Sequence, residues 1–152
     1  MLRKILAEIY ERDLGKLKDE IGQYADEADL WKTSEGITNS AGNLCLHLTG
    51  NLNHFFGAVL ANNGYVRDRD SEFADKNVSK SDMLADIDAT RNVVLSTLAE
   101  LTEEDLGKPY PIDVFGKPMT IGYFLTHLTT HFNWHLGQIN YHRRLVARSL
   151  SA

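Results

Sequence analysis

The stretch that decides the fold is residues 120–148, TIGYFLTHLTTHFNWHLGQINYHRRLVAR. It contains no proline, aspartate or glutamate, and its apolar residues recur three or four positions apart, as they do in an amphipathic helix. The interior glycines Gly122 and Gly137 lower the helix propensity without breaking this pattern. We therefore expect one long helix here, with an apolar stripe that faces a core.

A second stripe, made of polar residues, runs beside the apolar one. At about 100° per residue, a short arc of the helix surface collects five polar side chains, namely His127, His131, His135, Gln138 and His142. These residues lie at the edge of the core-facing surface, so they are placed to line a pocket between helices rather than to face open solvent.

Residues 40–63 form a matching segment. It also lacks aspartate and glutamate, although the chain has 21 acidic residues. Its polar stripe contains His47 and His54, with Asn43, Gly50 and Asn51 close by. The two segments together hold all six histidines of the chain. The sequence Asn62-Asn63-Gly64 is a typical end for this helix.

Two further segments, residues 2–24 and 81–101, have the same helical period. The linkers between the four segments are residues 25–39, 65–80 and 108–119, and the last of them holds all three prolines. That linker is expected to be an extended loop or a small hairpin. We predict an all-α fold, a four-helix bundle formed by residues 1–152 as one domain. The linkers exceed those of a simple up-down bundle, so at least one is expected to cross the bundle end.

Composition excludes several classes of function. The net charge of −5 provides no cationic footprint for nucleic acid. No run approaches the ~18–20 apolar residues of a membrane span, and the N-terminus lacks signal-peptide features, so we expect a cytoplasmic protein. The single cysteine, Cys45, rules out an internal disulfide and points away from the polar stripe of its helix.

The histidine spacing is compatible with a metal centre. One histidine from residues 40–63 and a pair four positions apart from residues 120–148 would give three neutral ligands with positions left open, as in catalytic sites. The same stripes would also suit a hydrogen-bonded polar seam without metal. His131-Phe-Asn-Trp-His135 lacks the glutamate of HExxH proteases, and ferritin-like sites need carboxylates that these helices lack.

The segment from His131 to Gln138 resembles the H-x-x-x-H-x-G-Q signature of the DinB/YfiT-like superfamily, and the residues around His47 resemble its second-helix motif. The resemblance implies a four-helix bundle without up-down connectivity, and one divalent metal held by His47, His131 and His135. It also implies a homodimer. His54, His127, Gln138 and Asn51 would then line the pocket or orient the ligands.

Some members of the superfamily are thiol-dependent transferases, and others are considered hydrolases or isomerases. Our leading hypothesis is a metal-dependent transferase or hydrolase that acts on a small molecule, with a water or a low-molecular-weight thiol as nucleophile. Zinc or nickel is the expected metal, with iron or manganese as alternatives. The general base remains unassigned among His54, His127 and a carboxylate of the first helix or the loops. The alternatives are a metal- or ligand-binding bundle without catalysis, and a structural bundle with a histidine seam.

Overall fold

The computed structural model describes the backbone of residues 1–150 and the side chains of residues 1–146. Four long helical segments form the bundle: α1 (Leu2–Gly22), α2 (Ala41–Leu52) with its π-helical continuation η2 (Asn53–Leu60), α4 (Lys80–Glu100) and α6 (Ile121–Leu150). Three short helices lie in the linkers: the 3-10 helix η1 (Glu27–Trp31), α3 (Arg69–Ala74) and α5 (Glu103–Leu106). Residues 1–150 include no strand, only two isolated bridges. The predicted all-α bundle is confirmed.

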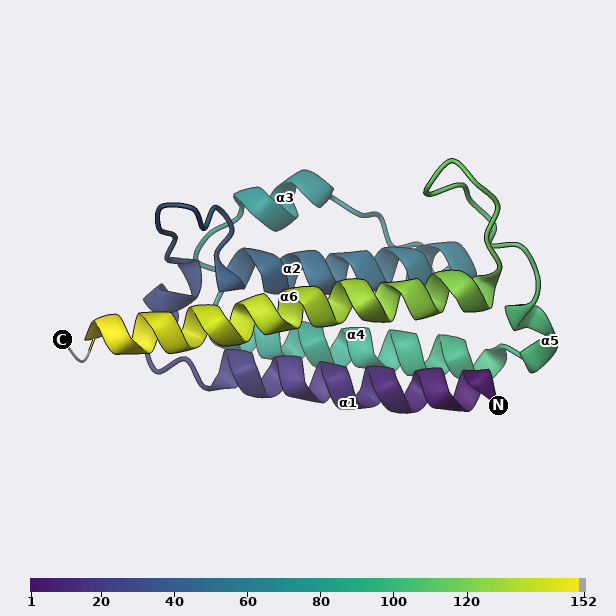
Figure 1. Ribbon diagram of the computed structural model, residues 1–152, viewed down its shortest axis with the longest axis horizontal. Helices are drawn as coiled ribbons and strands as arrows, with labels where there is room; N and C mark the ends of the chain where they lie inside the picture. Colours follow the sequence, from purple (N-terminus) through teal and green to yellow (C-terminus); the bar gives the residue numbers. More distant parts are fainter. Residues whose placement is uncertain (151–152) are drawn as a thin grey trace.

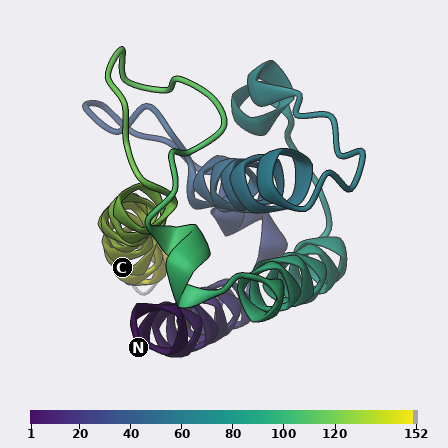
Figure 2. The same ribbon diagram turned by 90° about the vertical axis from the view of Figure 1, so that its right-hand side faces the viewer.

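The helices form two layers, with α2 beside α6 and α1 beside α4 (Figures 1 and 2). Helices α1 and α6 run in one direction along the bundle, and α2 and α4 run in the other (Figure 1). The connection from α2 to α4 therefore returns along the outside of α2, and it carries α3 there. The expected departure from up-down connectivity is confirmed, and its consequence is that the linker between α2 and α4 covers the outer side of α2.

Capping residues explain where the helices begin. The Ser40 hydroxyl accepts a hydrogen bond from the backbone N–H of Asn43 at the start of α2, and Ser79 caps α4 in the same way. The α2–η2 segment ends before Asn62 and Gly64, whose φ angles are 49° and 83°. These left-handed conformations stop a helix, as the Asn-Asn-Gly sequence predicted.

The proline-bearing linker is an extended loop whose two ends are joined. The backbone N–H of Tyr110 donates to the carbonyl of Met119 (2.8 Å), and that of Ile121 donates to the carbonyl of Lys108 (2.9 Å). A single antiparallel bridge joins Pro109 and Thr120. This loop fixes the position at which α6 begins, and so sets the register of its histidines.

Packing in the core between the two layers fixes which face of α6 points inward. The rings of Tyr10 and Phe56 meet edge to face with centroids 5.1 Å apart, and the Tyr10 hydroxyl donates to the carbonyl of Leu125 (2.7 Å). Phe124 and Phe132 of α6 are fully buried. Because these residues bury the apolar stripe of α6, its polar stripe is left at the boundary with α2.

Periodicity did not reveal three local features. Helices α3 and α5 have six and four residues, which is too short for an apolar repeat to develop. The segment expected to be one regular helix over residues 40–63 changes to π-helical hydrogen bonding from Asn53 onward. Stretches of π-helix are often found near functional sites. Within residues 1–150, no helix has the length and apolar character needed to cross a bilayer.

Candidate metal centre

Three histidines converge between α2 and α6. His47 comes from α2, and His131 and His135 come from successive turns of α6. One ring nitrogen from each lies within 4.8 Å of the others, and the Nε2 atoms of His47 and His131 are 3.1 Å apart. These are the three residues that the family resemblance implied as ligands, and the fold brings them together.

The geometry of the triad fits a single divalent ion. Zn–N bonds of about 2.0–2.1 Å place tetrahedral ligand atoms ~3.3 Å apart, close to the 3.1 Å between the Nε2 atoms of His47 and His131. The Nδ1–H of His135 donates to Oε1 of Gln138 (2.7 Å), and that of His47 donates to a carboxylate oxygen of Glu72 (3.0 Å). Each of these two rings therefore keeps its Nε2 lone pair for an ion. The Nδ1 atom of His131 has no hydrogen-bond partner among the described residues.

Electrostatics favours the neutral ligand form of the two α6 histidines. Burial, followed by the neighbouring His135 and His47, lowers the pKa of His131 to about 4. Burial also lowers the pKa of His135. Both imidazoles are thus unprotonated at neutral pH, which is the form that coordinates a metal.

Glu72 of α3 accepts a hydrogen bond from Nδ1 of His47, the ring nitrogen that does not face His131. Its carboxylate is 6% exposed and accepts from His47 through Oε1. Arg67 clamps the same carboxylate with two hydrogen bonds, Nε to Oε2 (2.8 Å) and Nη2 to Oε1 (2.9 Å). Burial raises the pKa of Glu72, but the hydrogen bonds from His47 and Arg67 outweigh that effect, and the pKa is lowered. Glu72 is therefore a buried anion held in place on the ring of His47.

A glycine on α2 makes room for this carboxylate. A Cβ at Gly50 would lie 2.1 Å from Oε2 of Glu72 and 2.7 Å from its Cδ. Gly50 is one turn after His47, so Glu72 can reach the histidine only across a position without a side chain. Sequence reasoning missed Glu72 and Arg67, because their linker has no periodic pattern. The presence of Gly50 in the polar stripe was the one available signal.

The other polar residues of the α6 stripe differ in whether they contact the triad. Gln138 contacts the triad directly, through His135. His142 does not: the Tyr24 hydroxyl donates to its Nδ1 (2.7 Å), and its Nε2–H donates to the carbonyl of Lys32 (2.8 Å). His142 therefore ties α6 to the connector after α1, although it shares a helical stripe with the ligands.

The remaining expected pocket residues are His127 of α6, His54 of η2 and Asn51 of α2. His127 lies against Phe115, with ring centroids 4.9 Å apart, and His54 lies against Phe55 at 4.8 Å. Burial and the nearby Arg67 lower the pKa of His54. Asn51 is buried, one turn after His47. The described side chains of these three residues make no hydrogen bond to the triad.

Cys45 is excluded from the chemistry of the centre. The thiol is in the core, with the residue 1% exposed, and burial raises its pKa well above the usual range. A thiol that stays protonated is a poor ligand and a poor nucleophile. The expectation that it points away from the histidine stripe agrees with this position.

Two solved structures share this fold. A DinB-like protein from Bacillus cereus ATCC 10987 superposes with a TM-score of 0.74 at 17% identity, over 93% of this chain and 91% of its own. A conserved protein from Enterococcus faecalis also gives 0.74, at 19% identity, over 95% and 96% of the two chains. No curated protein matches the sequence.

The model of a family described as proteins of unknown function, DUF1572, matches residues 5–150. This match spans nearly the whole chain, including all six histidines and the linker that carries Glu72. The fold that the resemblance to the DinB/YfiT-like superfamily implied is confirmed, because the DinB-like protein from Bacillus cereus shares it. The chain therefore belongs to the DUF1572 family, and its fold is that of the DinB-like protein from Bacillus cereus.

Proposed function

We propose that this protein binds one divalent metal ion through His47, His131 and His135 and uses it in a transferase or hydrolase reaction on a small molecule. The observation that carries the proposal is the convergence of three imidazole rings, two of which are anchored through Nδ1 so that Nε2 is free. When bound, an ion on three neutral ligands keeps its double charge and can activate a water or a thiol.

The chain's own residues have distinct parts in this proposal. Glu72 orients His47, and Gln138 orients His135. Glu72 is not free to accept a proton from a nucleophile, because both its oxygens are engaged by Arg67 and His47. We infer that Glu72 is a positioning residue, which fixes the tautomer and orientation of the His47 ring as carboxylate partners of metal-bound histidines do.

Elemental analysis of untagged protein tests the proposal, beside the double variant His47→Ala/His135→Ala. We expect close to one equivalent of zinc or nickel in the wild type, or of iron or manganese if those metals are supplied, and none in the variant. Thiol-transfer and hydrolysis substrates are then screened with both proteins. A wild-type chain that takes up no metal after incubation with zinc or nickel would refute the proposal.

A second candidate is a structural bundle in which the histidines form a hydrogen-bonded seam. The 3.1 Å separation of the His47 and His131 Nε2 atoms favours it, since one N–H between these atoms makes a normal hydrogen bond without metal. The seam predicts that a chelator leaves the melting temperature unchanged. Stoichiometric metal without turnover would instead indicate a binding protein that is not a catalyst.

We also propose that the protein forms a homodimer through α6. Four large side chains spaced along one face of this helix are exposed by 50–71%, namely Tyr123, Trp134, Tyr141 and Leu145. A row of exposed aromatic residues is typical of interfaces, where they anchor the contact. Analytical ultracentrifugation should give a dimer for the wild type and a monomer for Trp134→Glu. A wild-type monomer at all concentrations would refute this arrangement.

The compartment that we propose is the cytoplasm. The support is chemical: the only cysteine is buried and unpaired, so the fold uses no disulfide and tolerates a reducing environment. Cell fractionation with an antibody to the protein measures its location directly. Recovery in an extracellular or membrane fraction would contradict the assignment.

A further inference from the structure

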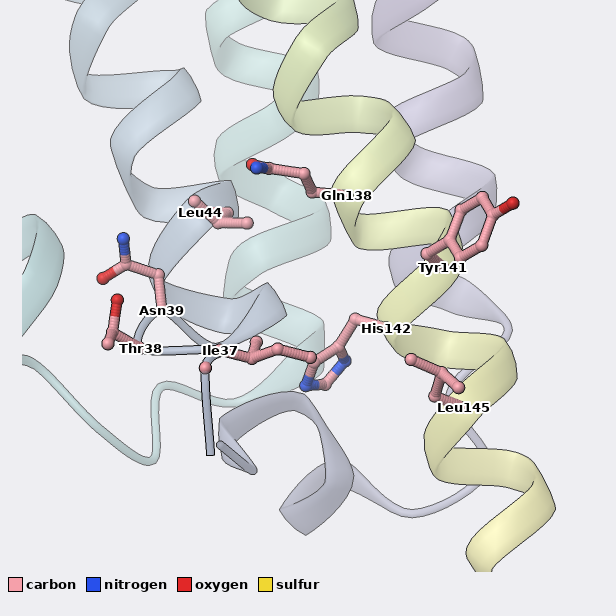
Figure 3. Close-up of a pocket in the computed structure, with 9 residues that line it drawn as sticks. Ile37, Thr38, Asn39, Leu44, Gln138, Tyr141, His142 and Leu145 are labelled. Atoms are coloured by element: carbon pink, nitrogen blue, oxygen red, sulfur yellow. The ribbon is translucent and has the colours of Figure 1, made fainter. Parts of the chain in front are cut away.

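A cavity of about 320 Å³ opens next to the histidine triad, between the same two helices. Figure 3 shows its walls: residues 37–39 of the connector and Leu44 of α2 on one side, and α6 from Gln138 onward on the other. Leu44 is three residues before His47, and Gln138 is three residues after His135. One helical turn, ~5 Å, therefore separates the cavity from the metal centre on each helix.

Gln138 contacts the metal centre and also lines the cavity. Its side-chain oxygen accepts from His135 (2.7 Å), while its amide nitrogen makes no hydrogen bond to any described residue. In Figure 3 the side chain extends from α6 toward Leu44, across the upper end of the cavity. Two N–H donors are thus presented at the end of the cavity that faces the triad.

The cavity wall has a definite chemical character. The apolar contributions come from Ile37, Leu44 and Leu145. The polar contributions are neutral, and the side chains of Thr38 and Asn39 make no hydrogen bond within the described part of the chain. None of the nine lining residues is a carboxylate, lysine or arginine. The wall therefore offers an anion no cationic partner.

We propose that this cavity binds a small uncharged molecule that presents a carbonyl oxygen to the amide nitrogen of Gln138 and an apolar body to Leu44 and Leu145. The volume is at the lower end of the range for small-molecule sites. That this molecule is the substrate rests on the function proposed above; the binding itself does not. Its carbonyl would lie at the end of the cavity nearest the metal-binding histidines.

The test uses the full-length ¹⁵N-labelled chain, once zinc-loaded and once treated with EDTA, titrated with N,N-dimethylbenzamide and followed by NMR. This probe is neutral, and it has a carbonyl acceptor and an aromatic body. We expect millimolar binding in both metal states, with shifts in the Gln138 side-chain amide and in residues 37–39. Benzoate, which has the same ring and a charge, should bind in the cavity at least tenfold more weakly.

Gln138→Glu is the diagnostic variant. Its carboxylate offers no donor to a carbonyl, so the affinity for dimethylbenzamide, measured in the EDTA-treated chain, should fall at least tenfold. Gln23→Glu makes the same exchange at the exposed end of α1 and should leave that affinity unchanged.

The inference is overturned if the shifts fall elsewhere or do not occur, if benzoate binds the cavity as tightly as the amide, or if Gln138→Glu binds the amide like wild type. If the chain binds zinc but the cavity residues show no shifts, the cavity proposal is refuted and the metal proposal is not. If the cavity residues shift in a chain that never takes up zinc, the metal proposal is refuted and the cavity proposal is supported.

Discussion

Adding a single methyl group at Gly50 should damage the metal centre without touching a ligand. The Cβ of Gly50→Ala would lie 2.1 Å from Oε2 of Glu72. Ordinary contact distances require the carboxylate to retreat by more than ~1 Å. The hydrogen bond from His47 Nδ1, now 3.0 Å, then becomes too long to orient the ring.

The size of the effect follows from the role of Glu72. Loss of a carboxylate that orients a metal-bound histidine costs 10–100-fold in metal affinity, or about 1.4–2.7 kcal/mol. Replacing a helical glycine by alanine otherwise stabilises the helix by up to ~1 kcal/mol. Gly50→Ala should therefore bind zinc 10–100-fold more weakly, although its intrinsic helix propensity is higher.

Gly137→Ala is the matched control. It lies on α6 between His135 and Gln138, and a Cβ there meets nothing within 4 Å. The control should bind zinc like wild type, with a melting temperature raised by ~2–4 °C. Zinc affinity is measured by competition with a chromophoric chelator, and melting by calorimetry in EDTA.

A double-mutant cycle with Glu72→Ala makes the test specific. Once the carboxylate is gone, the new methyl group has nothing to displace, so Gly50→Ala should have little further effect on zinc affinity. Equal affinities for Gly50→Ala and Gly137→Ala would refute the reasoning, and so would full additivity of the Gly50 and Glu72 substitutions.

Three further predictions concern residues outside the ligand set. His142→Ala should keep its metal but lose ~1–3 kcal/mol of stability in urea, because the hydroxyl of the buried Tyr24 loses its acceptor at 2.7 Å; loss of metal would contradict the ligand assignment. Burial raises the pKa of Glu20, but hydrogen bonds from Arg143 and Asn140 lower it overall. The stabilisation is therefore complete above pH 4.5, the ordinary pKa, and is lost as the pH falls through the lowered value. Glu20→Gln should flatten the decline of melting temperature between pH 7 and 3, and an unchanged pH profile would contradict this. Cys45 should react with a thiol reagent only after unfolding, and rapid labelling of the native chain would contradict its burial.

Much of the candidate site was readable from local periodicity. A pair of histidines four residues apart on a helix must lie on one face, so the helical pattern alone makes His131 and His135 neighbours. The polar stripe containing His47 showed which side of its helix would meet them. The prediction of His47 rather than His54 as the ligand came from the motif resemblance, and the structure places His47 beside His131 and His135.

Periodicity alone could not show which histidines of the α6 stripe meet His47. His127 and His142 share the stripe of the two candidate ligands, but one lies against Phe115 and the other bonds Tyr24 and Lys32. A stripe runs the full length of the helix, whereas a facing histidine is present at only one level. Which level meets His47 depends on how α6 is shifted along α2, and that shift is set by the core and by the loop that precedes α6.

By itself, the sequence determined the four long helices, their apolar faces and the histidine stripes, because each is a property of contiguous residues with a fixed repeat. Only the tertiary structure decided that Glu72 and Arg67 support His47, and that a neutral cavity adjoins Gln138. These contacts depend on the path by which the linker returns along α2 and on the packing of α2 against α6. Neither has a local sequence pattern, because the free energy that selects them comes from burial between distant segments.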